Sequence, residues 1–70
     1  MTEIKARTPG RIIAVLVREG DPIAARQTLA VLDAMKMEQP IFSREDGTVR
    51  EVFAKEGDFV KMGQVLLTVE

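Results

Sequence analysis

The chain has 70 residues, of which 46% are hydrophobic and 30% charged, and this balance predicts one small folded domain. Its formal net charge of −1 gives no electrostatic reason to expect a nucleic acid or an anionic membrane as a partner. The chain has no Cys and no His, so disulfides and cysteine nucleophiles are excluded and the commonest general base and metal ligand are missing. We therefore expect no catalytic residue, no metal site and no independent enzyme activity.

An internal repeat organises the chain. Residues 3–33 align with residues 40–70 at an offset of 37, and nine of the 31 pairs are identical, against about two expected from ordinary residue usage. Each copy contains a Gly, an apolar segment, the sequence Glu-Gly-Asp, and a Gln-x-Leu that opens a second apolar segment. We interpret this pattern as a duplication within a single domain that covers residues 1–70.

The predicted elements are short β-strands. In chain order, the apolar and β-branched segments are residues 12–17, 28–32, 48–54 and 65–69. The Glu-Gly-Asp sequences at 19–21 and 56–58 predict turns, and their symmetric repetition favours turns over paired carboxylates for acid–base catalysis. We expect an all-β flattened barrel or sandwich, in which two copies of about four strands pack face to face around a mostly aliphatic core.

Six residues, 34–39, join the two copies, and their chemistry is unusual for a hairpin. The sequence Ala-Met-Lys-Met at 34–37 contains no Gly, Asn, Asp or Pro, although tight hairpin turns favour Gly, Asn and Asp where φ is positive. A local rule that is broken in an otherwise consistent sequence indicates a functional site. We expect Lys36 at or beside the tip of a hairpin near the pseudo-twofold axis.

This linker, followed by Glu38, resembles the biotin attachment motif of the biotinyl/lipoyl domain family. The resemblance covers nearly the whole chain, because Leu-Ala-Val-Leu at 29–32 precedes the motif and Gly-Gln-Val-Leu-Leu at 63–67 follows it at the family's spacing. It implies a barrel-sandwich hybrid, which is a flattened β-barrel of two quasi-symmetric four-stranded halves. Arg26 departs from the family, since relatives often carry Gly before the Gln. The short connection at 17–21 leaves no room for a protruding thumb and resembles the thumbless type.

The resemblance implies a biotin carboxyl carrier, with biotin joined covalently to Lys36 by a biotin protein ligase through an acyl-adenylate. Such a carrier moves a carboxyl group on its biotin between the biotin carboxylase and carboxyltransferase sites of an acyl-CoA or keto acid carboxylase. The carrier makes no bond in that transfer, and tethering raises the local concentration of the cofactor at both sites. Because this chain has no His, the ligase must supply the base for the lysine amine.

The residues beside Lys36 each allow two interpretations. Met35 and Met37 either contact the ligase or carboxylase, as the motif implies, or fill the core, which is the usual role of Met. Glu38 is either a ligase contact or a solvated strand residue. Ala34 belongs to the same attachment motif.

Two other functions stay open. One is a lipoyl carrier of a 2-oxo acid dehydrogenase or glycine cleavage system, modified on the same lysine, although such domains usually carry Asp-Lys-Ala where this chain has Met35, Lys36 and Met37. The other is an unmodified barrel that serves as an adaptor. For each function we expect a monomer in the cytoplasm, since no signal-peptide pattern opens the chain and no apolar run reaches the length of a membrane span.

Overall fold

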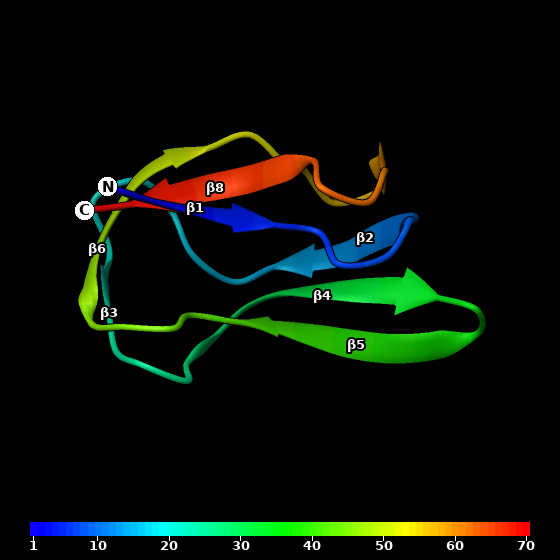
Figure 1. Ribbon diagram of the computed structural model, residues 1–70, viewed down its shortest axis with the longest axis horizontal. Helices are drawn as coiled ribbons and strands as arrows, with labels where there is room; N and C mark the ends of the chain where they lie inside the picture. Colours follow the sequence, from blue (N-terminus) through cyan, green and yellow to red (C-terminus); the bar gives the residue numbers. More distant parts are fainter.

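The computed structural model describes residues 1–70 as eight β-strands without a helix. The strands are β1 Thr2–Lys5, β2 Gly10–Val15, β3 Pro22–Ile23, β4 Thr28–Ala34, β5 Met37–Phe42, β6 Gly47–Val52, β7 Phe59–Val60 and β8 Val65–Val69. They form two four-stranded antiparallel sheets, in the orders β1-β8-β6-β3 and β5-β4-β2-β7 (Figure 1). The all-β class with two four-stranded halves is confirmed, and the sheets do not close into a barrel. No helix of the length and apolarity needed to cross a membrane is formed.

Each sheet takes two strands from each copy of the repeat. The first sheet combines β1 and β3 with β6 and β8, and the second combines β2 and β4 with β5 and β7. Our expectation that each copy packs as a unit against the other is therefore wrong. The copies interleave instead, so neither copy can complete its hydrogen-bonded ladders or cover its apolar side chains without the other.

The strand registers repeat with the offset of the sequence. Ile12 pairs with Leu32 in β2–β4, and Val49 pairs with Val69 in β6–β8. The register shifts directly after Ile12 on β2 and directly after Val49 on β6. The β4–β5 and β8–β1 pairs correspond in the same way. This agreement, which extends to the β-bulges, supports a duplication.

The same correspondence places the β4–β5 hairpin opposite the chain termini. The symmetric counterpart of that hairpin is the β8–β1 pair, which holds the C-terminal and N-terminal strands. Figure 1 shows the hairpin tip at one end of the molecule and both termini at the other. The pseudo-twofold axis therefore passes through the middle of the molecule, and our placement of the linker near that axis is wrong.

The turns of the two copies use the same side-chain hydrogen bonds. Oδ2 of Asp21 accepts a bond from the backbone N–H of Arg18 at 2.9 Å, and Oδ2 of Asp58 accepts one from the N–H of Lys55 at 2.9 Å. The glycine before each Asp has a φ of 88° or 94°, a conformation that Gly adopts without steric cost. The interpretation of both Glu-Gly-Asp sequences as turns is confirmed.

Two strands begin earlier than the sequence predicted. The segments expected at 12–17 and 48–54 lie at Gly10–Val15 and Gly47–Val52. A Cβ on either initial glycine would lie 2.5 Å from a backbone carbonyl oxygen, that of Asp33 or that of Glu70. Each glycine is therefore the first residue of its strand and not a residue of the preceding turn. Glycine fits there because a neighbouring backbone approaches it closely.

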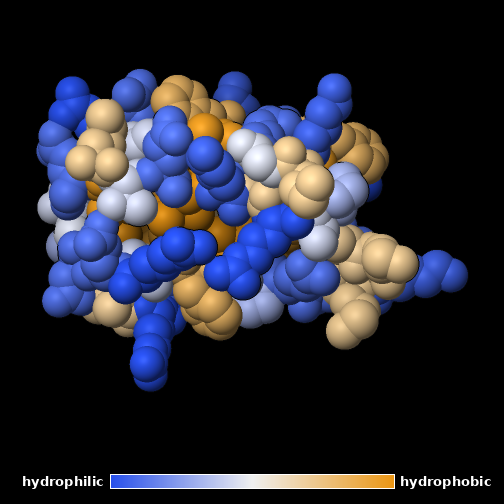
Figure 2. Space-filling model, viewed as in Figure 1, coloured by the Kyte–Doolittle hydropathy of each residue, from blue (hydrophilic) through white to orange (hydrophobic).

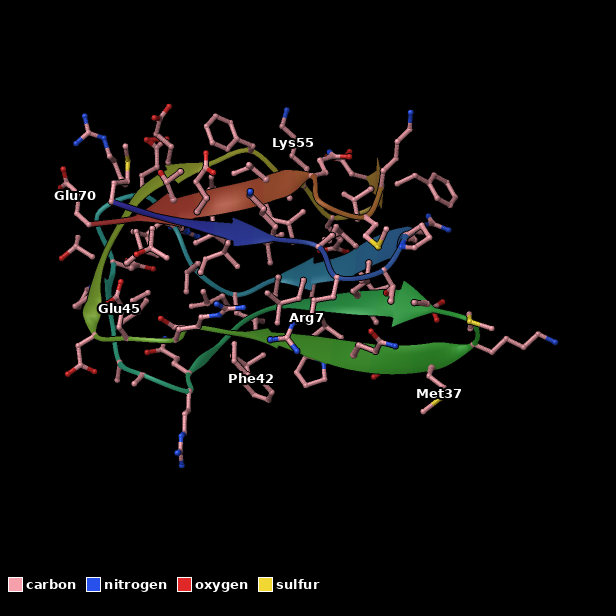
Figure 3. All side chains as sticks on the ribbon, viewed as in Figure 1. Arg7, Met37, Phe42, Glu45, Lys55 and Glu70 are labelled. Carbon is pink, nitrogen blue, oxygen red and sulfur yellow. The ribbon has the colours of Figure 1, made fainter.

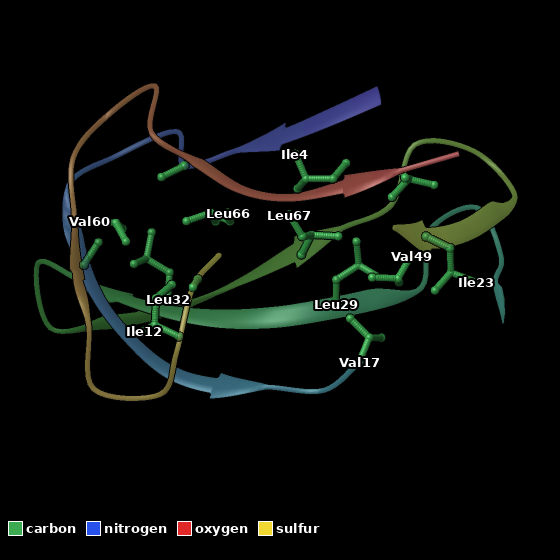
Figure 4. Close-up of a cluster of buried hydrophobic side chains, with 14 residues drawn as sticks. Ile4, Ile12, Val17, Ile23, Leu29, Leu32, Val49, Val60, Leu66 and Leu67 are labelled. Carbon is green, nitrogen blue, oxygen red and sulfur yellow. The ribbon is translucent and has the colours of Figure 1, made fainter. Parts of the chain in front are cut away.

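The core is aliphatic, as predicted. A single cluster of 14 buried residues fills the space between the sheets (Figure 4). Its members occur largely in symmetric pairs such as Leu29 with Leu66 and Ile12 with Val49, all at most 1% exposed. The three Phe residues lie outside this core and are between 51% and 79% exposed.

Candidate functional site

Lys36 lies in the two-residue turn that ends the β4–β5 hairpin. Ala34, the last residue of β4, pairs with Met37, the first residue of β5, so that only Met35 and Lys36 lie between the strands. Their φ angles are 52° and 64°. Positive φ at both central residues defines a type I′ turn, whose twist matches that of a hairpin. The linker of 34–39 is therefore a turn of two residues, and the other four residues belong to the strands.

The turn carries a backbone cost at two consecutive positions. A residue with a Cβ pays about 1–2 kcal/mol to adopt the left-handed conformation. Elsewhere in the chain the positive-φ positions are occupied by three glycines and by Arg26, with a φ of 70°. The turn at Arg26 therefore holds a residue with a side chain in a conformation that favours Gly. This agrees with the sequence, in which Arg26 stands where relatives often carry Gly. Strain of this kind concentrates at functional sites, and it singles out the hairpin tip.

The side chains of the tip divide into one anchor and an exposed group. Ala34 is 3% exposed and belongs to the core, whereas Met35 is 94% exposed and Met37 is 65% exposed. Figure 3 shows the side chain of Met37 at the hairpin end, directed away from the sheets. The core-packing interpretation is therefore wrong for both methionines. Glu38 is exposed on β5, which agrees with a solvated strand residue and leaves it available to a partner.

The amine of Lys36 is free of protein partners. Lys36 is exposed, and the ion pairs of the molecule are Lys5 with Glu3 and Arg50 with Glu70. No side-chain hydrogen bond of the molecule involves the amine either. An amine in this position is open to an external enzyme.

The tip stands on a well-supported base. β4 is paired on both sides, with β2 and with β5, and its buried side chains include Leu32 at 2% exposure. The edge strand β5 is linked to the loop after β1, because Oγ of Thr8 donates to Oε1 of Gln39 at 3.4 Å. Sites on such paired strands are held more firmly than sites on loops. The hairpin can thus present its turn in a fixed position.

A row of exposed side chains crosses the sheet next to the turn. Glu38, Asp33, Arg11 and Phe59 are register partners from β5 through β4 and β2 to β7. Cζ of Arg11 lies 5.9 Å from the centroid of the Phe59 ring, within range of a cation–π contact.

The sequence analysis did not identify Arg11 and Phe59. The signal was present as a difference between the copies, because their repeat counterparts are Thr48 and Pro22.

Known proteins share this fold and this sequence. The family described as "Biotin-requiring enzyme" matches residues 2–69. The chain is 45% identical over 64 residues to the biotin/lipoyl attachment protein of Bacillus subtilis, covering 91% of this chain and 88% of that protein. It is 41% identical over 64 residues to the biotin carboxyl carrier protein of Streptococcus mutans, covering 91% of this chain and 49% of that protein. It is 36% identical to the mitochondrial propionyl-CoA carboxylase alpha chain of Homo sapiens, covering 96% of this chain and 9% of that protein.

Two solved structures have the same architecture. A single-chain, multi-domain long-chain acyl-CoA carboxylase matches with a TM-score of 0.89 and 29% identity, over 94% of this chain and 7% of that one. The urea carboxylase of Kluyveromyces lactis matches with a TM-score of 0.92 and 23% identity, over 99% of this chain and 6% of that one, and at this identity it shows the fold alone.

These comparisons and the geometry of the hairpin define the class of protein. The chain belongs to the biotin-requiring enzyme family of biotinyl/lipoyl attachment domains. The description of the family and the biotin carboxyl carrier protein among the relatives indicate biotin as the cofactor. The chain offers what covalent attachment of biotin requires, which is an exposed and unpaired lysine amine at the end of a supported hairpin.

Proposed function

We propose that this chain is a biotin carboxyl carrier and that Lys36 is its attachment residue. One observation carries the assignment of the residue: Lys36 lies in a strained, outward-facing turn with a free amine. The other three lysines of the chain are Lys5, which pairs with Glu3, and Lys55 and Lys61, which lie outside the strands in the turns on either side of β7. Lys36 alone combines the motif with the hairpin.

Attachment forms one amide bond. Nζ of Lys36, starting from its ammonium form, loses two of its three protons and bonds to the carboxyl carbon of biotin, while the bond from that carbon to the phosphate oxygen of the acyl-adenylate breaks and AMP leaves. With no His in the chain, the base belongs to the ligase. Met35 and Met37, which are exposed on either side of Lys36 in the sequence, would contact that ligase, and the buried Ala34 would hold the turn against the core. Once attached, biotin supplies the ring nitrogen that takes up and releases a carboxyl group.

The domain would act as a carrier between two active sites of a carboxylase. Its partners would be a biotin carboxylase and a carboxyltransferase, and the final acceptor an acyl-CoA or a keto acid; the names of two relatives, a propionyl-CoA carboxylase and a long-chain acyl-CoA carboxylase, support the acyl-CoA. The carrier supplies position and local concentration, and its partners supply the chemistry. We keep a monomer in the cytoplasm as the expected state, which size-exclusion chromatography and cell fractionation with streptavidin detection would test.

Intact mass after co-expression with a biotin protein ligase, in biotin-supplemented medium, tests this proposal. We expect the chain to gain one biotinyl group and the Lys36→Arg variant to gain none, because arginine keeps the charge but offers no amine to acylate. The matched Lys55→Arg variant should gain the group as the parent does.

A folded parent chain that gains no mass beside an active ligase would contradict the proposal. If the chain instead gained one lipoyl group under a lipoate ligase, the lipoyl carrier would replace the biotin carrier. If neither ligase modified the chain, the adaptor function would remain.

A further inference from the structure

The hairpin end exposes apolar side chains that the fold does not require. Phe59 is 79% exposed on β7, and Met35 of the turn and Met37 at the start of β5 are 94% and 65% exposed. The repeat provides an internal control, because Pro22 occupies the position equivalent to Phe59 and Thr48 the position equivalent to Arg11. The pairing of Pro22 with Thr48 in β3–β6 has the same register as that of Phe59 with Arg11 in β7–β2. The backbone is therefore built equally well without an aromatic ring or a cation.

Phe59 and Arg11 lie close enough to Lys36 to be covered by an enzyme that acts on it. Arg11 pairs with Asp33 on β4, and Phe59 pairs with Arg11 one strand further. Because neighbouring strands are separated by roughly 4.8 Å, Phe59 lies about 10 Å across the sheet from the strand that leads into the turn. A protein interface of standard size covers about 800 Å² on each partner, which corresponds to a radius of roughly 16 Å around its centre.

The two side chains are suited to recognition. The contact between the Arg11 guanidinium and the Phe59 ring orients both groups before a partner arrives. Aromatic residues, Met and Arg are the side chains that protein interfaces concentrate. At the hairpin end in Figure 2, hydrophobic side chains are gathered at the surface among hydrophilic ones. An apolar ring beside a positive charge fits a partner surface with an apolar recess and an acidic side chain at its rim.

We propose that Arg11, Met35 and Phe59 form one docking patch for the biotin protein ligase, the hairpin-end patch. This inference rests on the proposed function. The ligase is the partner that must approach the turn itself, because it acylates the bare amine of Lys36. A carboxylase active site meets a biotin held at the end of an extended lysine arm and can stand further from the sheet. Met35 belongs to the attachment motif, and Arg11 and Phe59 extend recognition onto β2 and β7.

Steady-state kinetics of a biotin protein ligase that modifies the parent chain tests the patch, with the unmodified chain as the varied substrate. We expect Phe59→Ser to raise KM about tenfold and to leave kcat within about twofold, because the ring contributes to binding and not to amide formation. The matched control is Phe53→Ser. Phe53 is 53% exposed, and it directly follows β6, a strand of the sheet that does not contain the hairpin.

A second pair of variants copies the other end of the molecule. Phe59→Pro and Arg11→Thr install the residues that the same backbone accepts at positions 22 and 48. We expect both to fold and to raise KM. Arg11→Thr should also make KM less sensitive to salt, because an ion pair with the ligase is lost.

The outcomes separate this inference from the proposed function. If the parent chain is never biotinylated, the proposed function fails. If Lys36 is biotinylated and Phe59→Ser leaves KM unchanged, or Phe53→Ser raises it equally, the hairpin-end patch is wrong while the carrier assignment stands. If the ligase is indifferent to the variants and only carboxylation of the biotinylated variants is impaired, the patch serves the carboxylase and the ligase proposal is overturned.

Discussion

The hairpin end and the terminal end of this molecule share one backbone plan and differ in what they carry. At the hairpin end, β4 and β5 are joined by Met35 and Lys36, whereas at the other end the equivalent strands β8 and β1 hold the two chain termini. The turns, glycine contacts and core positions between the ends occur in pairs. Features present at both ends therefore belong to folding, and features at the hairpin end alone are candidates for function.

Strain and exposure follow this division. The terminal end has no equivalent of the positive φ angles of the turn, because the chain is open there. Phe59 and Arg11 at the hairpin end correspond to Pro22 and Thr48 at the terminal end. Neither packing nor hydrogen bonding requires this difference in side chains. Duplication thus produced two similar ends, and only one was elaborated.

The largest expected effect tests the symmetry of the core. Leu29→Ala and Leu66→Ala each remove a side chain that is 0% exposed, at equivalent positions in the two sheets. We expect each to lower the free energy of unfolding by about 3 kcal/mol, through lost burial and the cavity left behind. Urea denaturation measures both. Losses that differ by more than about 1.5 kcal/mol would break the equivalence of the two halves.

A smaller effect should reveal where the symmetry ends. Gly10→Ala and Gly47→Ala each place a Cβ 2.5 Å from a carbonyl oxygen. For Gly10 that oxygen belongs to Asp33, inside the paired strand β4, whereas for Gly47 it belongs to Glu70, the last residue of the chain. We expect a loss of about 2 kcal/mol for Gly10→Ala and about 1 kcal/mol for Gly47→Ala, because Asp33 is held in a strand that is paired on both sides, whereas Glu70 lies outside β8 and its backbone bonds to Thr48 alone.

Thermal or urea unfolding of the two variants provides the comparison. Equal losses would show that the terminal end is as rigid as the hairpin end, and the distinction between them would have to be abandoned.

The smallest effect concerns the turn itself. The double substitution Met35→Asn and Lys36→Gly supplies the residues that a type I′ turn prefers, and it should raise the free energy of unfolding by about 1 kcal/mol. The same variant cannot be biotinylated, because the proposed attachment lysine is gone. Urea unfolding of the variant and of the parent, with intact mass to confirm the loss of biotinylation, would measure how much the native turn lowers the free energy of unfolding. A variant less stable than the parent would contradict the assignment of strain to these two residues.

Much of the fold could be predicted from the sequence because the information was local or repeated. The Glu-Gly-Asp turns follow from a Gly with positive φ and an Asp that accepts a backbone N–H three residues before it. The repeated Gln was visible but unexplained, and in the structure Oε1 of Gln27 and of Gln64 accepts the backbone N–H of the residue three positions earlier. The aliphatic core follows from composition and strand pattern.

The exchange of strands between the sheets could not be predicted, because a repeat does not say which strands will pair. Equivalent segments have similar side chains, so β2 could pair within its own copy or across to the other copy. It does both, with β4 and with β7. Local propensity is the same for either choice, and the choice depends on closing both sheets over one core.

The sequence by itself determined the class of fold, the Gly and Asp turns and the position of Lys36 in a linker that lacks the usual turn residues. All of these depend on residues that are near one another along the chain. Tertiary structure alone decided that the two halves interleave and that the hairpin lies opposite the termini. It also brought Arg11 and Phe59 to the face beside Met35, because antiparallel pairing joins positions 11, 33 and 59 that are far apart in the sequence. Strand register, which is a long-range property, made a surface out of residues that no local pattern connects.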